Sequence, residues 1–105
     1  RRPDVVHLGV GGDGHTASLF PNTTALDEWN RWMVANWVPS QHEFRITATF
    51  PLLWSARLVL VQAEGEGKAA AVRDSFEGLT PAGRLGEGDA RVEWHVDPAA
   101  ASLIS

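Results

Sequence analysis

An apolar run that passes directly into a glycine-rich loop is the feature that most constrains the fold of this chain. Residues 5–10, Val-Val-His-Leu-Gly-Val, are mainly apolar and lack the alternation of a half-buried strand, which is typical of a strand covered on both faces of a parallel sheet. Four glycines lie in 9–14, so the backbone of the loop can adopt positive φ and approach a ligand closely. Open α/β folds bind ligands at such turns, beyond the carboxyl ends of their strands. The sequence therefore predicts an α/β protein with a ligand site at this loop.

Strands and helices are predicted to alternate along the rest of the chain. Apolar or β-branched runs predict four further strands, at 32–38, 45–50, 57–62 and 91–96. Helices are expected in the intervening segments, at 16–20, 25–29, 52–56, 68–76 and 98–103. Residues 78–90 are rich in glycine, proline and charge and predict a surface loop. This alternation favours an α/β fold built on a parallel sheet.

The composition is that of an ordinary globular protein, and 105 residues are enough for one domain or part of one. The formal net charge is −4 and no basic patch is present, so we expect no nucleic-acid partner. No apolar run is long enough to span a membrane. The chain has no cysteine, which excludes thiolate metal sites and fits a reducing compartment. Because it begins without methionine and almost at a strand, we expect it to be part of a longer protein.

Three of the glycines, at 9, 11 and 14, match the spacing of a dinucleotide-binding fingerprint. That motif requires a long helix opening at its third glycine and a second strand that ends in an acidic residue. Pro21 follows seven residues after Gly14 and leaves no room for such a helix. The nicotinamide-cofactor interpretation is therefore disfavoured, and no cofactor is expected.

Asp13 and His15 place a carboxylate and an imidazole two residues apart in the same loop. Histidine titrates near neutrality and can take a proton from water, while a carboxylate can orient the ring and stabilise its protonated form. Without cysteine, and with Ser18 predicted on a helix, water is the expected nucleophile. The alternative is a tight turn in which Asp13 caps a helix and His15 is merely exposed, and the residues alone leave both open. Two ligand-type side chains fall short of the three that a catalytic zinc takes, so no metal is predicted.

The loop and the segments after it resemble the 6-phosphogluconolactonase family. The similarity is most specific at 8–21, Leu-Gly-Val-Gly-Gly-Asp-Gly-His-Thr-Ala-Ser-Leu-Phe-Pro. Further segments follow in the family's order: Arg-Ile-Thr-Ala-Thr-Phe-Pro at 45–51, Leu-Trp-Ser-Ala-Arg at 53–57, Gly-Glu-Gly-Lys-Ala at 65–69, and the stretch at 97–103. Trp54 departs from the pattern, in which asparagine is usual. The resemblance covers nearly the whole chain.

The resemblance implies a Rossmann-like parallel sheet with helices on both faces, incomplete because its N-terminal portion is absent. Residues 1–105 would be the C-terminal part of a single domain. The implied reaction is hydrolysis of 6-phospho-D-glucono-1,5-lactone to 6-phosphogluconate in the oxidative pentose phosphate pathway, by a cytoplasmic enzyme that is monomeric when full length. A non-catalytic sugar-phosphate binding module is one alternative. A glucosamine-6-phosphate deaminase is another, but that family carries a catalytic glutamate where this chain has Phe20.

The same resemblance implies roles for individual residues. His15 is the expected general base, and Asp13 the carboxylate that orients it. Substrate contacts are implied for five further residues: Gly11, Gly12 and Gly14 in the loop, Arg45 at the substrate phosphate, and Lys68. The amides of Gly11 and Gly12 are the expected donors.

The remaining histidines and the tryptophans are predicted to be structural or exposed. His7 is expected to be a core residue, His95 a structural strand residue and His42 an exposed loop residue. The five tryptophans are expected to pack in the core, and they are Trp29, Trp32, Trp37, Trp54 and Trp94.

Overall fold

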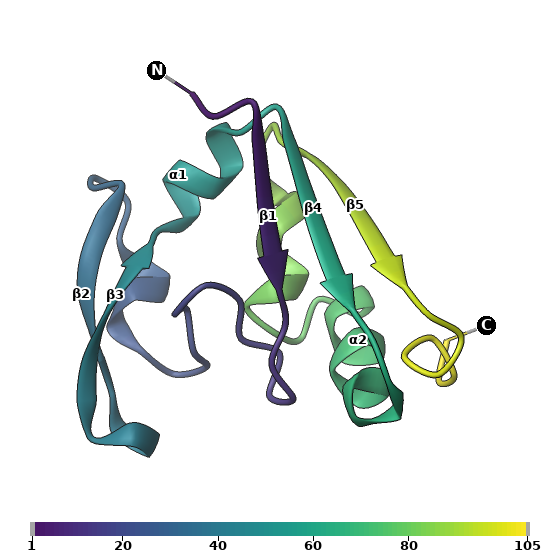
Figure 1. Cartoon of the computed structure of the whole chain (residues 1–105). Helices are drawn as coiled ribbons and strands as arrows, with labels where there is room; N and C mark the ends of the chain where they lie inside the picture. Colours follow the sequence, from purple (N-terminus) through teal and green to yellow (C-terminus); the bar gives the residue numbers. More distant parts are fainter. Residues whose placement is uncertain (1, 105) are drawn as a thin grey trace.

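Three parallel strands form the main sheet of the computed structural model, which describes residues 2–104 (Figure 1). The strands are β1 at Val5–Gly9, β4 at Leu58–Ala63 and β5 at Arg91–Val96. β4 lies in the middle and pairs with both neighbours, so that Val5 lies opposite Leu58 and Leu58 opposite Arg91. The predicted parallel sheet is confirmed.

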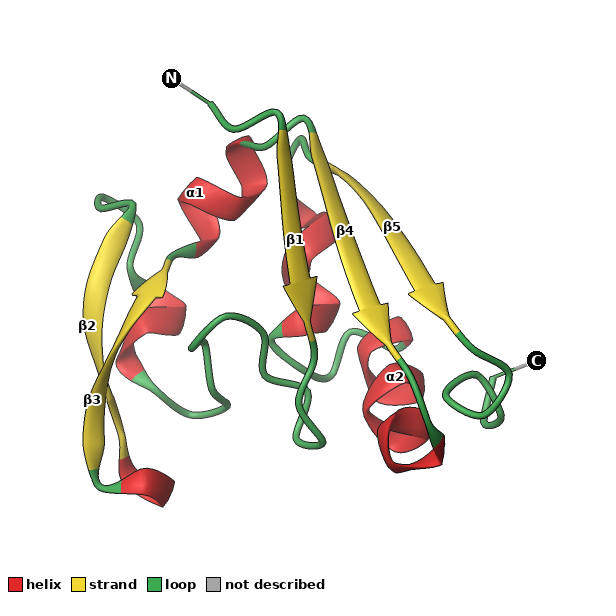
Figure 2. Cartoon of the chain, in the orientation of Figure 1, coloured by secondary structure: helices red, strands yellow, loops and turns green. Residues whose placement is uncertain are grey.

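Three helices of the described residues lie on one face of this sheet (Figure 2). They are α1 at Phe50–Ser55, α2 at Ala69–Phe76 and the 3-10 helix η4 at Ala82–Glu87. Side chains from these helices pack against the central strand in one core, whose fully buried members include Phe50, Leu53, Val59, Val61, Val72 and Leu85. The burial of apolar area in this layer is what stabilises the sheet.

No helix covers the other face of the sheet within residues 2–104, so the predicted helices on both faces are present on one face only. Within β1, Val6 and Leu8 turn toward the core while Val5 and His7 turn away and are exposed. The prediction that His7 is a core residue is therefore wrong. A strand's side chains alternate between its two faces, and only one face has a covering layer here.

The strands β2, at Met33–Val38, and β3, at Glu43–Ala48, form a separate antiparallel ribbon. The sequence predicts both strands but wrongly places them in the parallel sheet. Only the short 3-10 helix η2, at Pro39–Gln41, and His42 connect them. A parallel crossover needs a dozen or more residues, so this connection permits only an antiparallel hairpin.

Three predicted helices are wrong. Residues 16–20 form an irregular turn with an isolated bridge between Thr16 and Leu19. Residues 98–103 are turns, and in place of a helix at 25–29 there is only the 3-10 helix η1, at Thr24–Asp27. Short segments gain few hydrogen bonds for the cost of helix nucleation. Thr23 makes no side-chain cap bond to η1, whereas Asp97 accepts the Ala100 N–H at 2.9 Å and is still followed only by turns.

The predicted surface loop at 78–90 is partly a packed segment. It contains η4, in which Leu85 is 1% exposed. The Trp54 indole N–H donates to the carbonyl of Arg84 at 2.8 Å and ties this segment to α1. The other two expected helices are confirmed: that at 52–56 is α1, which begins two residues earlier, and that at 68–76 is α2, preceded by the 3-10 helix η3 at Glu66–Lys68.

Three of the five tryptophans do not pack in the core. Trp29, Trp32 and Trp37 are between 41% and 49% exposed, whereas Trp54 and Trp94 contact the core. No helix among residues 2–104 has the length and apolar character needed to cross a lipid bilayer.

Candidate active site

The glycine loop leaves the carboxyl end of β1 and folds back on itself in a tight turn. The Gly14 amide donates to the Gly11 carbonyl and the Gly11 amide to the His15 carbonyl, each at 2.9 Å. Gly14 has φ +84°, a conformation that a side chain disfavours. A Cβ on Gly11 would lie 2.1 Å from the His15 ring. The turn therefore needs glycine at both positions to bring the ring over the backbone.

His15 is held by Asp13 through two contacts. Asp13 Oδ1 lies 2.6 Å from His15 Nδ1 and also accepts the His15 main-chain N–H at 3.0 Å. Partial burial acts to raise the pKa of Asp13, but these hydrogen bonds and the adjacent ring outweigh it, so the pKa lies below its usual value. An ionised carboxylate only accepts hydrogen bonds, so Nδ1 of His15 carries a proton. In the neutral ring, Nε2 then holds the free lone pair.

Phe20 stacks against one face of the His15 ring. Phe20 is 6% exposed, and the two ring centroids lie 4.1 Å apart. Thr16 anchors the intervening backbone because its hydroxyl donates to the Gly9 carbonyl at 2.8 Å. The imidazole is therefore fixed on one side by a carboxylate and on another by an aromatic face.

Lys68 reaches the same loop from η3. Its ammonium donates to the Val10 carbonyl at 2.8 Å, although the two residues are 58 positions apart in the sequence. Lys68, His15 and Gly11 together line a hollow of about 440 Å³, whose other lining residues are His7, Leu8, Gly9, Val10 and Ala17. This volume is within the range of small-molecule sites. The structure thus brings together three of the seven residues that the sequence predicts for the site.

Arg45 lies on β3, outside the lining of this hollow. Its guanidinium carbon is 5.9 Å from the centroid of the Phe20 ring, on which His15 also stacks. Arg45 donates to Ser18 Oγ at 3.3 Å, to Gln41 Oε1 at 2.8 Å and to Glu43 Oε2 at 3.3 Å. Arg45 therefore does not line the hollow, but it contacts Phe20 and Ser18, which lie in the segment that follows His15.

The loop amides differ in what they can offer a ligand. Those of Gly11 and Gly14 already donate within the turn, so the prediction that the Gly11 amide faces a substrate is wrong. In the part of the chain that the structure describes, the Gly12 amide donates to no protein acceptor, and Gly12 is exposed. Gly12 is therefore the loop residue with an amide available to a ligand.

Asn36 is a structural residue of the site that sequence reasoning missed. It is fully buried on β2, and its amide donates to the Ser18 carbonyl and the Thr23 hydroxyl while its Oδ1 accepts the Ala25 N–H. These bonds hold the segment that follows His15 against the β2–β3 ribbon. The available signal was a single asparagine within the apolar strand at 32–38.

The other histidines lie outside the glycine loop. His42 is exposed, as predicted, and adopts a left-handed conformation at φ 49° that ends η2. His95 is exposed on β5 and contacts Glu93 at 3.4 Å. His7 is also exposed, and its Nε2 lies 3.0 Å from Gln62 Oε1.

Comparison with known proteins gives consistent relatives. A 6-phosphogluconolactonase of Chlamydia trachomatis is 49% identical over 82 residues, which are 77% of this chain and 30% of that protein. A human 6-phosphogluconolactonase is 38% identical over 107 residues, covering 97% of this chain and 42% of that protein. The chain thus spans less than half the length of these relatives.

Solved structures agree with the sequence relatives. The crystal structure of 6-phosphogluconolactonase from Leishmania guyanensis superposes with a TM-score of 0.84 at 28% identity, covering 97% of this chain and 42% of that one. The family model described as glucosamine-6-phosphate isomerases/6-phosphogluconolactonase matches residues 1–94. The chain therefore belongs to the glucosamine-6-phosphate isomerase/6-phosphogluconolactonase family.

Proposed function

We propose that this chain supplies the catalytic base and part of the substrate site of a 6-phosphogluconolactonase, which hydrolyses 6-phospho-D-glucono-1,5-lactone to 6-phosphogluconate. The observation that carries the proposal is the His15–Asp13 pair, with 2.6 Å between Nδ1 and Oδ1, at the edge of a hollow that also holds Lys68. The names of relatives that are 38% and 49% identical support it. The pathway, a cytoplasmic location and a monomeric full-length enzyme are part of the same proposal.

In the proposed mechanism His15 activates water. With Nδ1 protonated against Asp13, Nε2 takes a proton from water as the water oxygen attacks the lactone carbonyl carbon. The resulting oxyanion accepts a hydrogen bond from the Gly12 amide, whose N–H makes no hydrogen bond within the turn. When the bond from the carbonyl carbon to the ring oxygen breaks, the proton on Nε2 passes to that oxygen, which becomes a hydroxyl. The carboxylic acid so formed ionises and releases its proton to solvent. The reaction consumes only the lactone and one water, and His15 returns to its neutral form.

Lys68 and Arg45 are the cations proposed to hold the substrate phosphate. Lys68 uses one of its three donors on Val10, which leaves two for an anion. Hydrogen bonds to Ser18 and Gln41 hold Arg45 near Phe20, and a guanidinium suits the geometry of a phosphate.

Phe20 favours hydrolysis over deamination. The position five residues after the histidine carries an apolar ring that is 6% exposed and stacked on His15. Such a side chain cannot transfer the protons that opening and isomerising an amino sugar require.

The test measures formation of 6-phosphogluconate by the full natural chain and its His15→Ala variant, above the spontaneous hydrolysis of the lactone. We expect His15→Ala to lower kcat by roughly 10²- to 10⁴-fold, the usual contribution of a general base. His95→Ala, which removes an exposed histidine outside the hollow, serves as the control and is expected to match the wild type.

Three outcomes would contradict parts of this proposal. Unchanged turnover by His15→Ala would show that His15 is not the general base. Binding of the phosphorylated lactone without turnover by the wild type would indicate a sugar-phosphate binding module. Ammonia release from glucosamine 6-phosphate would indicate the deaminase reaction.

A further inference from the structure

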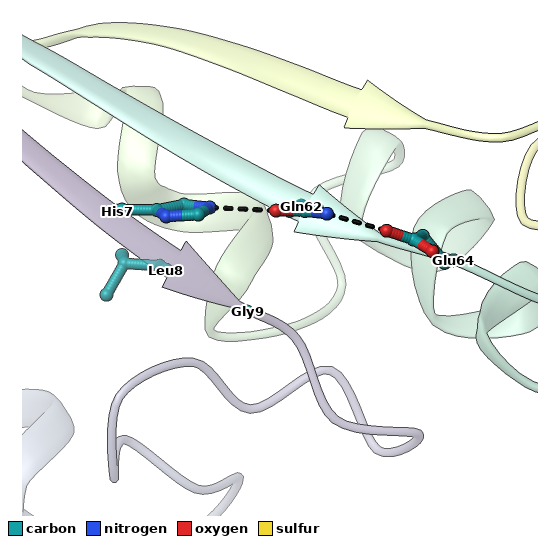
Figure 3. Close-up of a pocket in the computed structure, with 5 residues that line it drawn as sticks. All are labelled: His7, Leu8, Gly9, Gln62 and Glu64. Atoms are coloured by element: carbon teal, nitrogen blue, oxygen red, sulfur yellow. Dashed lines mark hydrogen bonds between the residues drawn. The ribbon is translucent and has the colours of Figure 1, made fainter.

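A second hollow adjoins the one that contains His15. It has a volume of about 360 Å³ and is lined by His7, Leu8, Gly9, Gln62 and Glu64 (Figure 3). Three of these residues, His7, Leu8 and Gly9, also line the hollow of His15 and Lys68. His7 therefore lines both hollows, with the candidate catalytic base in the first and the Glu64 carboxylate in the second, which is called the extension.

A chain of hydrogen bonds fixes the chemistry of His7. The Glu64 carboxylate accepts the Gln62 side-chain N–H at 2.6 Å, which leaves Gln62 Oε1 directed at His7 Nε2, 3.0 Å away (Figure 3). Because Oε1 can only accept, Nε2 of His7 must be the donor. In the neutral ring Nδ1 is then an acceptor, and in the part of the chain that the structure describes it has no hydrogen-bond partner.

The two hollows differ in the groups that they present. The extension offers acceptors, which are the carboxylate of Glu64 and Nδ1 of His7. The first hollow offers the ammonium of Lys68. A phosphate would be repelled by Glu64 and attracted by Lys68, whereas sugar hydroxyls are donors that suit the acceptors.

We propose that His7, held by Gln62 and Glu64, is a specificity-determining residue that accepts a hydrogen bond from a ring hydroxyl of the phosphorylated lactone, with the phosphate directed away from Glu64. This inference rests on the proposed function and extends it to the orientation of the substrate. A hydroxyl lost from the substrate leaves His7 without its ligand, so the enzyme distinguishes the natural lactone from a deoxy analogue.

The experiment compares 6-phosphogluconolactone with its 2-, 3- and 4-deoxy analogues in the full natural chain. We expect the wild type to favour the natural lactone over one of these analogues by roughly 3- to 10-fold in kcat/KM, the value of one hydrogen bond. His7→Leu is expected to lose that preference mainly through KM, while kcat on the natural lactone changes little. Gln62→Leu, which keeps the imidazole but removes its partner, is expected to lose part of the preference.

His42→Asn is the control, since His42 is an exposed histidine that lines none of the hollows around His7, and asparagine tolerates its left-handed conformation. His95 is unsuitable, because it lines a further hollow together with His7 and Gln62. Circular dichroism and thermal denaturation establish that the His7→Leu protein is folded. A wild-type preference that survives in His7→Leu, or a wild type that does not distinguish any of the analogues, would overturn the inference and leave the proposed hydrolysis intact. Absence of lactone turnover by the wild type would overturn both.

Discussion

The position of the His15 ring depends on one missing side chain. A Cβ on Gly11 would lie 2.1 Å from both Cε1 and Nδ1 of the ring, well inside van der Waals contact. The ring can therefore occupy its place beside Asp13 only because residue 11 is glycine. This steric requirement explains the glycine better than a backbone amide for the substrate, since the Gly11 amide is already used within the turn.

We expect Gly11→Ala to push the His15 ring away from Asp13 and to lower kcat by about 10²-fold, because a displacement of about 1 Å in a catalytic group can have that effect. The measurement is lactone turnover by the full natural chain, with thermal denaturation to follow stability. Gly86→Ala is the control, because a Cβ there meets no atom within 4 Å. Equal turnover in the two variants would show that the ring tolerates the added methyl group.

Among the elements, the β2–β3 ribbon is joined to the segment that follows His15 by hydrogen bonds of two buried polar side chains. Asn36 connects β2 to Ser18, Thr23 and Ala25, and Thr47 of β3 accepts the Ser18 N–H at 3.0 Å. Both side chains are at most 1% exposed. The ribbon thus positions the backbone between His15 and Phe20 without belonging to the main sheet.

We predict that Asn36→Ala lowers the free energy of unfolding by about 2–4 kcal/mol, because it leaves a buried amide, carbonyl and hydroxyl without their partner. Urea denaturation measures the change. Asn30→Ala is the matched control, since Asn30 is exposed and its side chain makes no hydrogen bond within residues 2–104. A loss as small as that of the control would mean that the ribbon is held by other contacts.

For the whole molecule, one carboxylate joins two strand ends at the carboxyl edge of the sheet. Asp97 follows β5, and Gly65 follows β4. The Asp97 carboxylate accepts the Gly65 N–H at 3.1 Å and the Ala100 N–H at 2.9 Å. The hydrogen bonds from Ala100 and then Gly65 hold the pKa of Asp97 below its ordinary value of 3.8. The ionised form is therefore favoured in the folded protein.

A lowered pKa gives this contact a defined pH dependence. Its contribution to stability is fully present above the unfolded value of 3.8 and is lost as the pH falls from there through the lower folded pKa. We expect wild type to exceed Asp97→Asn in unfolding free energy at about pH 7, and the difference to disappear by about pH 2. Denaturation across this range, with Asp89→Asn as an exposed control, measures it. A difference that is constant with pH would show that the charge of Asp97 plays no part.

The parts of the fold that could be predicted are those that depend on local pattern. The strands near 5–10, 57–62 and 91–96 and the helix near 68–76 are confirmed, because continuous apolar runs and a helix bounded by glycines act over a few residues. Pairing is not local. The strand predicted at 32–38 is confirmed as β2, and the one predicted at 45–50 overlaps β3, which lies two residues earlier because Phe50 begins α1. Their four-residue connection requires an antiparallel ribbon.

The sequence alone determined the chemical inventory of the loop: an aspartate and a histidine two residues apart, the glycines that bend the backbone around them, and Phe20 in place of an acid. The tertiary structure alone decided which distant groups meet that loop. Lys68 contacts Val10, 58 positions away in the sequence, and Arg45 lies beside the Phe20 ring. His7 lies on the sheet face away from the core, where it contacts Gln62. The physical reason is that spacing along the chain governs turns and strand faces, whereas contacts between strands depend on register and on which face of the sheet is covered.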